Sequence, residues 1–211
     1  MAKEPIAGRV KTRLAEAVGD ARALALYRAF LSDLAKALFS PDEWRSELAH
    51  AEPEAGPFLR SAFSAWTFRT QGEGSLGDRL ARCARTEDEG DVVLVGSDAP
   101  LLTALVVRDA FHALTDRAEV VFAPAPDGGY SLVGLRHGVP GAEVFASVRW
   151  STEHALADSR AAAERAGCRV ALLPEAMDVD VAADLETLRA ALAANPGLAP
   201  VTCRALAEGP A

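Results

Sequence analysis

The segment "DVVLVGSDAP" at residues 91–100 constrains the fold more than any other part of the chain. Val92–Val95 form a continuous apolar run, which is typical of a strand that is buried on both faces. The run stops at Gly96, and Pro100 is a favoured residue for the first turn of a helix. A buried strand followed directly by a helix predicts an α/β fold with a covered sheet.

Strands and helices alternate along the rest of the chain. Apolar runs predict further strands at 118–125, 130–136 and 168–174. The segment at 66–72 is interpreted as a strand that leads into a loop, and 44–50 is a weaker candidate. Helical spacing of apolar residues predicts helices at 20–38, 76–85, 101–115, 152–166 and 181–193. This order predicts a three-layer α/β/α sandwich with a mostly parallel sheet. At this length we expect a single domain over residues 1–211.

Composition excludes several classes of protein. The net charge of -8 argues against general binding of nucleic acid, which needs an electropositive surface. The sequence has no apolar run of the roughly 18 residues that a membrane span needs, and no signal peptide pattern, so we expect no membrane partner. The three cysteines lack metal-ligand spacing and are interpreted as reduced thiols of a cytoplasmic protein.

A basic cluster near the start of this acidic chain points to a small anionic ligand. In "GRVKTRL", Gly8 allows a close backbone approach, and Arg9, Lys11 and Arg13 offer donors that suit phosphate oxygens. The alternative is a solvated N-terminal segment whose basic residues have no ligand.

Two acidic segments could hold a divalent cation. Asp98 lies just past the end of the strand at 92–95, at the sheet edge where ligands of open α/β sheets bind. Asp180, in "MDVDVAADL", lies between a predicted strand and the last strong helix. Carboxylates of this kind bind Mg²⁺ or Mn²⁺ beside a diphosphate. The alternative for both residues is capping of the helix that follows.

The segment "APDGGYSLVGL" joins two predicted strands. Asp127, Gly128 and Gly129 form a tight turn, and a plain hairpin would explain both glycines. Tyr130 could stack on a substrate or lie in the core.

Six motifs in this order resemble one bacterial protein family: "KEPIAGRVKTRLA", "GEGSLGDRL", "VGSDAP", "PDGGYSLVGL", "RWST" and "DVDVAADL". The family is that of the radical-SAM/selenodomain-associated, or arsenosugar-biosynthesis-type, glycosyltransferases. It belongs to the GT-A-like (Rossmann-like) nucleotide-diphospho-sugar transferase superfamily. The resemblance runs from Lys3 to about Leu192, nearly the whole chain.

The resemblance implies a role for each matching residue. Nucleotide binding is implied for Gly8, Arg9, Lys11, Arg13, Gln71, Gly74, Leu76, Gly77, Ser97 and Asp98. Acceptor binding is implied for Asp127, Gly128, Gly129, Tyr130, Trp150, Ser151 and Thr152. Catalysis is assigned to Asp127, Arg9 and Lys11, and an Mg²⁺ or Mn²⁺ site to Asp98 and Asp180.

The chain departs from the family pattern at two places. The family begins with a buried strand before the lysine that matches Lys3, and here only two residues precede it, so we expect the sheet to lack its usual first strand. The family also favours an acidic residue where this chain has Ser75, which removes a carboxylate near the predicted base pocket.

Three functions fit these residues. The first is a metal-dependent glycosyltransferase that uses a nucleotide-diphosphate sugar and a small-molecule acceptor. The second is a nucleotidyltransferase that transfers NMP from an NTP to a phosphorylated small molecule. The third is a non-catalytic relative that binds a nucleotide. Separately, a strand edge left unpaired by the missing first strand would favour a homodimer.

Overall fold

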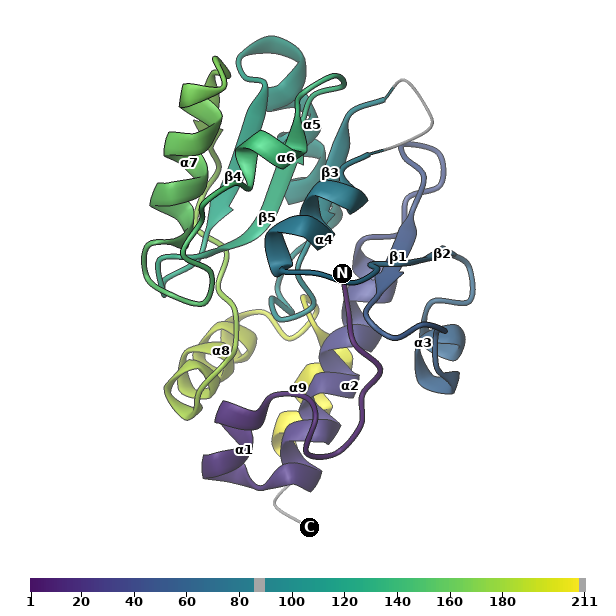
Figure 1. Cartoon of the computed structure of the whole chain (residues 1–211). Helices are drawn as coiled ribbons and strands as arrows, with labels where there is room; N and C mark the ends of the chain where they lie inside the picture. The colour runs from purple at the N-terminus through teal and green to yellow at the C-terminus, as the bar shows by residue number, and fades with distance from the viewer. Residues whose placement is uncertain (86–89, 209–211) are drawn as a thin grey trace. The chain divides into compact units, whose positions relative to one another are not determined.

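The computed structural model describes residues 1–85 and 90–208 (Figure 1). Contacts within the chain divide it into two compact units whose segments alternate along the sequence. The sheet unit consists of Met1, 70–96 and 105–177, and the helical unit consists of 2–69, 97–104 and the segment from 178 onward. The single-domain organisation over 1–211 stays a prediction.

The sheet unit is built on a four-stranded sheet with the order β3-β5-β4-β6. Its strands are β3 (Val92–Val95), β4 (Val120–Pro124), β5 (Tyr130–Leu135) and β6 (Val170–Leu172). β5 runs antiparallel to both β3 and β4, whereas β6 is parallel to β4. Three of these strands therefore run in one direction and β5 runs in the other, so the sheet is mixed, with two antiparallel pairings and one parallel pairing. The β4–β5 hairpin is confirmed.

Helices cover both faces of this sheet. They are α4 (Leu76–Cys83), α5 (Ala104–Asp116), α6 (Gly141–Val144) and α7 (Ala155–Arg165). Phe122 and Val133 face a buried cluster that contains residues of α4, α6 and α7. On the opposite face, a Cβ added to Gly134 would meet Val121 and Leu114, which is a residue of α5. The predicted three-layer α/β/α arrangement is thereby confirmed for this unit (Figure 1).

Strand β3 was predicted to be buried on both faces, and this prediction is wrong. All four of its residues, Val92–Val95, are half-buried. β3 lies at the end of the strand order and is paired on one side by β5. The carbonyl of Val95 accepts a 2.6 Å hydrogen bond from the amino group of Met1. The strands that are buried along most of their length are β4, where Val120–Ala123 are fully covered, and β5, where Ser131–Leu135 are buried.

The helical unit is organised around one long amphipathic helix. Its elements are α1 (Thr12–Val18), α2 (Asp20–Ala37), β1 (Glu47–His50), α3 (Pro57–Ala62), β2 (Thr67–Thr70), α8 (Ala182–Ala194) and α9 (Pro200–Ala207). α2 packs against α1 and α9, and Leu26, Phe30 and Leu31 on its buried face are fully covered. β1 and β2 form a separate two-stranded sheet, which confirms the strands predicted at 44–50 and 66–72. Ala2 bridges to His50 of β1 in parallel.

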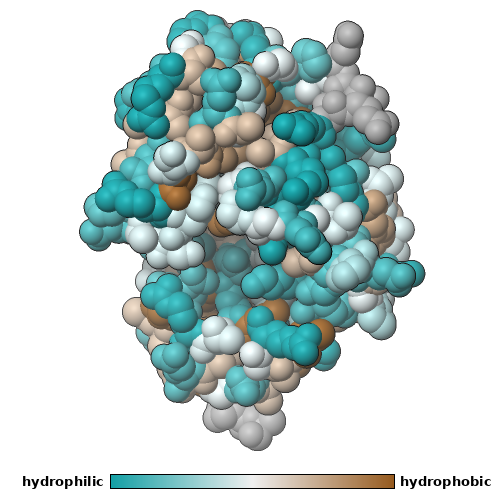
Figure 2. All heavy atoms as spheres, in the orientation of Figure 1, coloured by the Kyte–Doolittle hydropathy of each residue, from teal (hydrophilic) through white to brown (hydrophobic). Residues whose placement is uncertain are grey.

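The face of the molecule in Figure 2 is largely hydrophilic, and its hydrophobic residues are scattered among polar ones. The large exposed hydrophobic side chains come from several elements, for example Phe39, Leu105 and Leu172. Scattered apolar residues are ordinary on protein surfaces. Among the helices of the described residues, none combines the length and the hydrophobicity that crossing a lipid bilayer demands.

Candidate functional site

The basic loop comprises residues 3–13, of which the last two open α1, and an acidic side chain fixes it in place. The carboxylate of Glu4 accepts hydrogen bonds from the backbone amides of Phe58 (3.0 Å) and Leu59 (3.3 Å) in the first turn of α3. These amides have no partner within their own helix, and a carboxylate is favoured at that end. Pro5 and Val10 of the loop are buried. The loop is therefore anchored at both of its ends.

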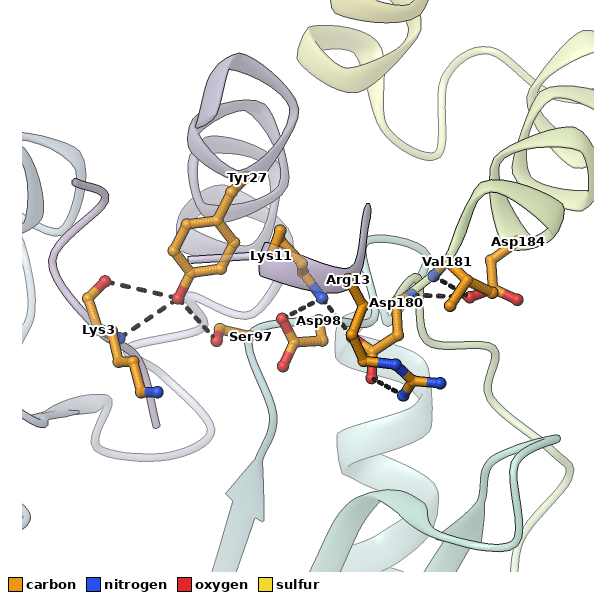
Figure 3. Close-up of polar contacts among 9 residues, drawn as sticks. All are labelled: Lys3, Lys11, Arg13, Tyr27, Ser97, Asp98, Asp180, Val181 and Asp184. Atoms are coloured by element: carbon orange, nitrogen blue, oxygen red, sulfur yellow. Dashed lines mark hydrogen bonds and ion pairs between the residues drawn. The ribbon is translucent and has the colours of Figure 1, made fainter. Parts of the chain in front are cut away.

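Lys11 directs its ammonium group at two carboxylates (Figure 3). Its Nζ forms ion pairs with Oδ1 of Asp98 and, at 2.9 Å, with Oδ1 of Asp180. The side chain of Lys11 is 3% exposed, so the charge is covered by protein. Burial alone would lower the pKa of Lys11, but Asp98 and Asp180 outweigh it and the pKa is raised. The ammonium is therefore held in its charged form between the two carboxylates.

The backbone joins the segments that carry these two carboxylates. The amide of Val179 donates a 2.9 Å hydrogen bond to the carbonyl of Asp98. The side chain of Asp184 accepts from the amides of Asp180 (2.7 Å) and Val181 (2.8 Å), so Asp184 stabilises the start of α8 (Figure 3). The side chains of Asp98 and Asp180 are 46% and 39% exposed.

This geometry decides against capping as the role of either carboxylate. The first turn of α8 is bonded by Asp184 instead of Asp180. α5 begins at Ala104, several residues beyond Asp98. Both side chains are therefore available to Lys11 and to a ligand.

Two guanidinium groups of the same loop face solvent. Arg9 is exposed, and its backbone amide closes a turn with the carbonyl of Ile6 at 3.1 Å. Arg13 lies on α1 with its side chain 69% exposed, and its Nη1 is 4.0 Å from Oδ2 of Asp180. Gly8 adopts φ +72°, a conformation that favours glycine. The loop thus presents two exposed cations and one buried cation.

A buried tyrosine supports Ser97, the neighbour of Asp98. The hydroxyl of Tyr27 on α2 lies 3.0 Å from Oγ of Ser97 and accepts a 3.3 Å hydrogen bond from the amide of Lys3 (Figure 3). Burial raises the pKa of Tyr27. Tyr27 lies within the helix that was predicted at 20–38, but the contact with Ser97 was not predicted. The signal was available, because a buried tyrosine hydroxyl normally finds a partner.

The predicted nucleotide-binding residues of the sheet unit lie at the start of helix α4. Ser75 and Asp78 form a reciprocal capping box at the first turn of α4, with bonds of 3.2 Å and 2.9 Å. Gly74 adopts φ +104°, and Gln71 is buried. Serine and aspartate cap helices almost equally well. Ser75 therefore preserves the cap even though it removes the carboxylate of the family pattern.

The turn at Asp127 packs on the segment that follows Trp150. Oδ1 of Asp127 accepts a 2.8 Å hydrogen bond from the amide of Gly129, which closes the turn. The carbonyl of Gly128 accepts a 3.0 Å hydrogen bond from the amide of Leu156. The backbone at Gly128 has φ +84°, and an added Cβ would lie 2.2 Å from the carbonyl oxygen of Glu153. This site needs glycine for two separate reasons.

Aromatic rings join three of the predicted motifs in the sheet unit. The centroid of the Tyr130 ring lies 4.8 Å from that of Phe122 and 6.3 Å from that of Trp150. The hydroxyl of Tyr130 lies 3.2 Å from Oγ of the buried Ser159. Trp150 also lies against Gly77, where an added Cβ would be 3.1 Å from its Nε1. Tyr130 thus takes the packed position, one of its two predicted alternatives.

The residues after Trp150 form a tight bend. Ser151 adopts φ +60°, and Oγ1 of Thr152 donates a 2.7 Å hydrogen bond to the carbonyl of Arg149. Arg149 in turn pairs with Asp158 through two 2.8 Å bonds. Hydrogen bonds from Arg149 hold the pKa of Asp158 well below its usual range.

The predicted site residues thus fall into two groups, each assembled within its own unit. The helical unit brings together Gly8, Arg9, Lys11, Arg13, Ser97, Asp98 and Asp180. The sheet unit holds Gln71, Gly74, Leu76, Gly77, Asp127, Gly128, Gly129, Tyr130, Trp150, Ser151 and Thr152.

Two solved structures are similar to this chain. A solved structure from Desulfovibrio desulfuricans G20, named as a nucleotide-diphospho-sugar transferase, is similar with 30% identity and a TM-score of 0.86, covering 98% of this chain and 91% of that one. A CMP:2-keto-3-deoxy-manno-octonic acid synthetase complexed with CTP shares the fold, with 15% identity and a TM-score of 0.51 over 92% and 96% of the two chains.

A search of curated proteins finds no significant match. Residues 34–152 match the family described as "Uncharacterized protein conserved in bacteria (DUF2064)". This match spans more than half of the chain, and the fold is that of the nucleotide-diphospho-sugar transferases. The chain therefore belongs to the DUF2064 family, within the GT-A-like nucleotide-diphospho-sugar transferase superfamily.

Proposed function

We propose that the chain is a metal-dependent glycosyltransferase that takes a nucleotide-diphosphate sugar as its donor. One observation carries the proposal: Asp98 and Asp180, from segments far apart in sequence, converge on Lys11 with both carboxylates half-exposed. The 30% identity to a structure named as a nucleotide-diphospho-sugar transferase supports the same class of donor.

The donor set fits one divalent cation. Carboxylate oxygens are the ligands that Mg²⁺ and Mn²⁺ prefer beside phosphates, usually one or two from the protein. Asp98 and Asp180 each give Oδ1 to Lys11. This leaves Oδ2 of Asp98 for another cation, whereas Oδ2 of Asp180 lies 4.0 Å from Nη1 of the exposed Arg13. When bound there, the ion would neutralise charge on the diphosphate as the nucleotide leaves.

Arg9 and Arg13 would supply the remaining positive charge for the diphosphate. Guanidinium groups match phosphate oxygens in geometry, and both side chains are exposed enough to reach a ligand. Such fixed charges stabilise a leaving group and are commonly the largest catalytic contribution. On the sheet unit, the exposed carboxylate of Asp127 would orient or deprotonate an acceptor hydroxyl.

Nucleotidyl transfer from an NTP is the second candidate. Two exposed arginines beside a carboxylate pair would serve a triphosphate as well as a diphosphate. The attacking group would then be a phosphate of the acceptor, with pyrophosphate as the leaving group. The association with radical-SAM or arsenosugar chemistry, which the sequence motifs imply, stays a prediction.

Thermal unfolding of the full chain with and without Mn²⁺ tests these candidates. UDP-, GDP- and dTDP-sugars and the four NTPs are added in turn, because a ligand of the native state raises the melting temperature by mass action. We expect an Mn²⁺-dependent rise with one sugar nucleotide. A preference for an NTP would replace the proposal with nucleotidyl transfer. A cooperative transition that no nucleotide moves would contradict both candidates, because each of them requires a bound nucleotide.

A further inference from the structure

The side chain of Lys11 is buried, whereas a lysine that binds phosphate has to be exposed to its ligand. The side chain of Lys11 is 3% exposed, whereas that of Arg13 in the same loop is 69% exposed. The backbone at Lys11 adopts φ +49°, in the left-handed region that is costly for a residue with a side chain. From this backbone the ammonium of Lys11 points at Asp98 and Asp180 instead of at solvent (Figure 3).

The ammonium uses the same kind of oxygen that a metal ion would use. It contacts Oδ1 of Asp98 and Oδ1 of Asp180. Two carboxylates this close repel each other unless a cation lies between them. Lys11 supplies that cation from within the chain, which holds the pair together before any ligand arrives.

We propose that Lys11 is the built-in counter-cation of the Asp98–Asp180 pair and competes with metal for it, and that the pair holds a single divalent ion. The inference rests on the proposed function and assigns Lys11 as a positioning residue. Diphosphate contact then falls to Arg9 and Arg13, whose side chains are exposed. A site for one ion suits a diphosphate donor, whereas a symmetric two-metal clamp holds ions roughly 3.5–4 Å apart.

The test is a calorimetric titration of the nucleotide-free protein with MnCl₂. The variant Lys11→Met keeps the length of the stem and removes the charge. We expect one Mn²⁺ per chain in both proteins and binding at least about tenfold tighter in Lys11→Met, because a competing charge a few ångströms away is lost. The matched control is Lys36→Met, which removes an exposed lysine in the last turn of α2 and should leave Mn²⁺ affinity unchanged.

Melting temperature in EDTA gives a second measurement that does not depend on activity. Lys11→Met leaves the carboxylates without their cation, so its melting temperature should fall in EDTA and rise more with Mn²⁺ than that of the wild type. Equal Mn²⁺ affinity in wild type and Lys11→Met, or two ions bound per wild-type chain, would overturn the inference.

The outcomes separate this inference from the proposed function. Sugar-nucleotide binding by the wild type, with Mn²⁺ affinity unchanged in Lys11→Met, would remove the role of Lys11 and leave the function standing. Tighter Mn²⁺ binding by Lys11→Met, in a chain that no nucleotide stabilises, would support the role of Lys11 and contradict the function.

Discussion

The carboxylate of Asp33 accepts a 2.7 Å hydrogen bond from the backbone amide of Thr202, 169 residues further along the chain. Asp33 lies on α2 and is 3% exposed, and it also accepts from the amide of Val201 at 3.0 Å. Both donors belong to the first turn of α9, where helix amides have no partner of their own. One buried side chain therefore fixes the start of a helix that lies close to the end of the described chain.

Replacing Asp33 with Ala is expected to destabilise the protein by about 2–3 kcal/mol, because two buried amides lose a charged acceptor. Asp33→Asn keeps one acceptor oxygen and should cost less. Urea unfolding followed by far-UV circular dichroism measures both changes. The control Asp42→Ala removes an exposed carboxylate and should stay within about 0.5 kcal/mol of wild type. Equal midpoints for Asp33→Ala and Asp42→Ala would contradict the role of Asp33.

Much of the layered fold could be predicted from the chain, because β4, β5, α2 and α7 carry strong local patterns. Two of the helices that were missed, α3 and α9, depend on distant partners. α9 begins at Pro200 and is capped by Asp33, and α3 is capped by Glu4. No local pattern of residues records such contacts.

The sequence predicted which residues form the candidate site, but it did not predict which of them contact one another. Asp98 and Asp180 were expected near the same ligand, and both do converge on Lys11. Lys11 itself was expected to face phosphate oxygens. Its spacing within "GRVKTRL" is the same for a buried and an exposed side chain, so the sequence could not distinguish them. The structure shows a left-handed backbone at Lys11 and a side chain buried against both carboxylates, and no local sequence pattern records either feature.

Gly128→Ala is expected to destabilise the sheet unit by more than about 2 kcal/mol, since a left-handed backbone and a steric clash add together. The added methyl would lie 2.2 Å from the carbonyl of Glu153. Gly138→Ala is the matched control, because Gly138 has the same φ of +84° with nothing within 4 Å. It should cost about 1 kcal/mol. Denaturant unfolding of both variants measures the difference, and equal losses would argue against packing of the turn on Glu153.

Glu119 gives the sheet unit a stability that depends on pH. Its carboxylate accepts hydrogen bonds from the side chain and the amide of Arg169, and these lower the pKa of Glu119 from 4.5 to about 2. A lowered pKa means that the unfolded chain takes up the proton first as the pH falls. The contribution of Glu119 is therefore full above about pH 4.5 and lost by about pH 2.

Comparison of wild type with Glu119→Gln should show this window. The urea midpoint of the wild type should exceed that of Glu119→Gln around neutral pH, and the difference should disappear as the pH falls through the window. Arg169→Met removes the main partner of Glu119. In this background, adding Glu119→Gln should change the urea midpoint less than it does in the wild type. A difference that stays constant with pH would show that the Glu119–Arg169 pair does not form in solution.

Asp98→Asn is expected to abolish most of the Mn²⁺-dependent stabilisation by a sugar nucleotide. The amide keeps the size of the side chain but loses the charge that pairs with Lys11 and would ligate the ion. We expect nucleotide affinity in Mn²⁺ to fall by more than about tenfold, the lower end of losses seen even for residues that only support a metal's ligands. Asp109→Asn removes the same charge from an exposed position on α5 and should bind like wild type. Undiminished binding by Asp98→Asn, in a chain that still melts cooperatively in EDTA, would exclude Asp98 from the metal and leave the arginines of the basic loop as the whole of the nucleotide site.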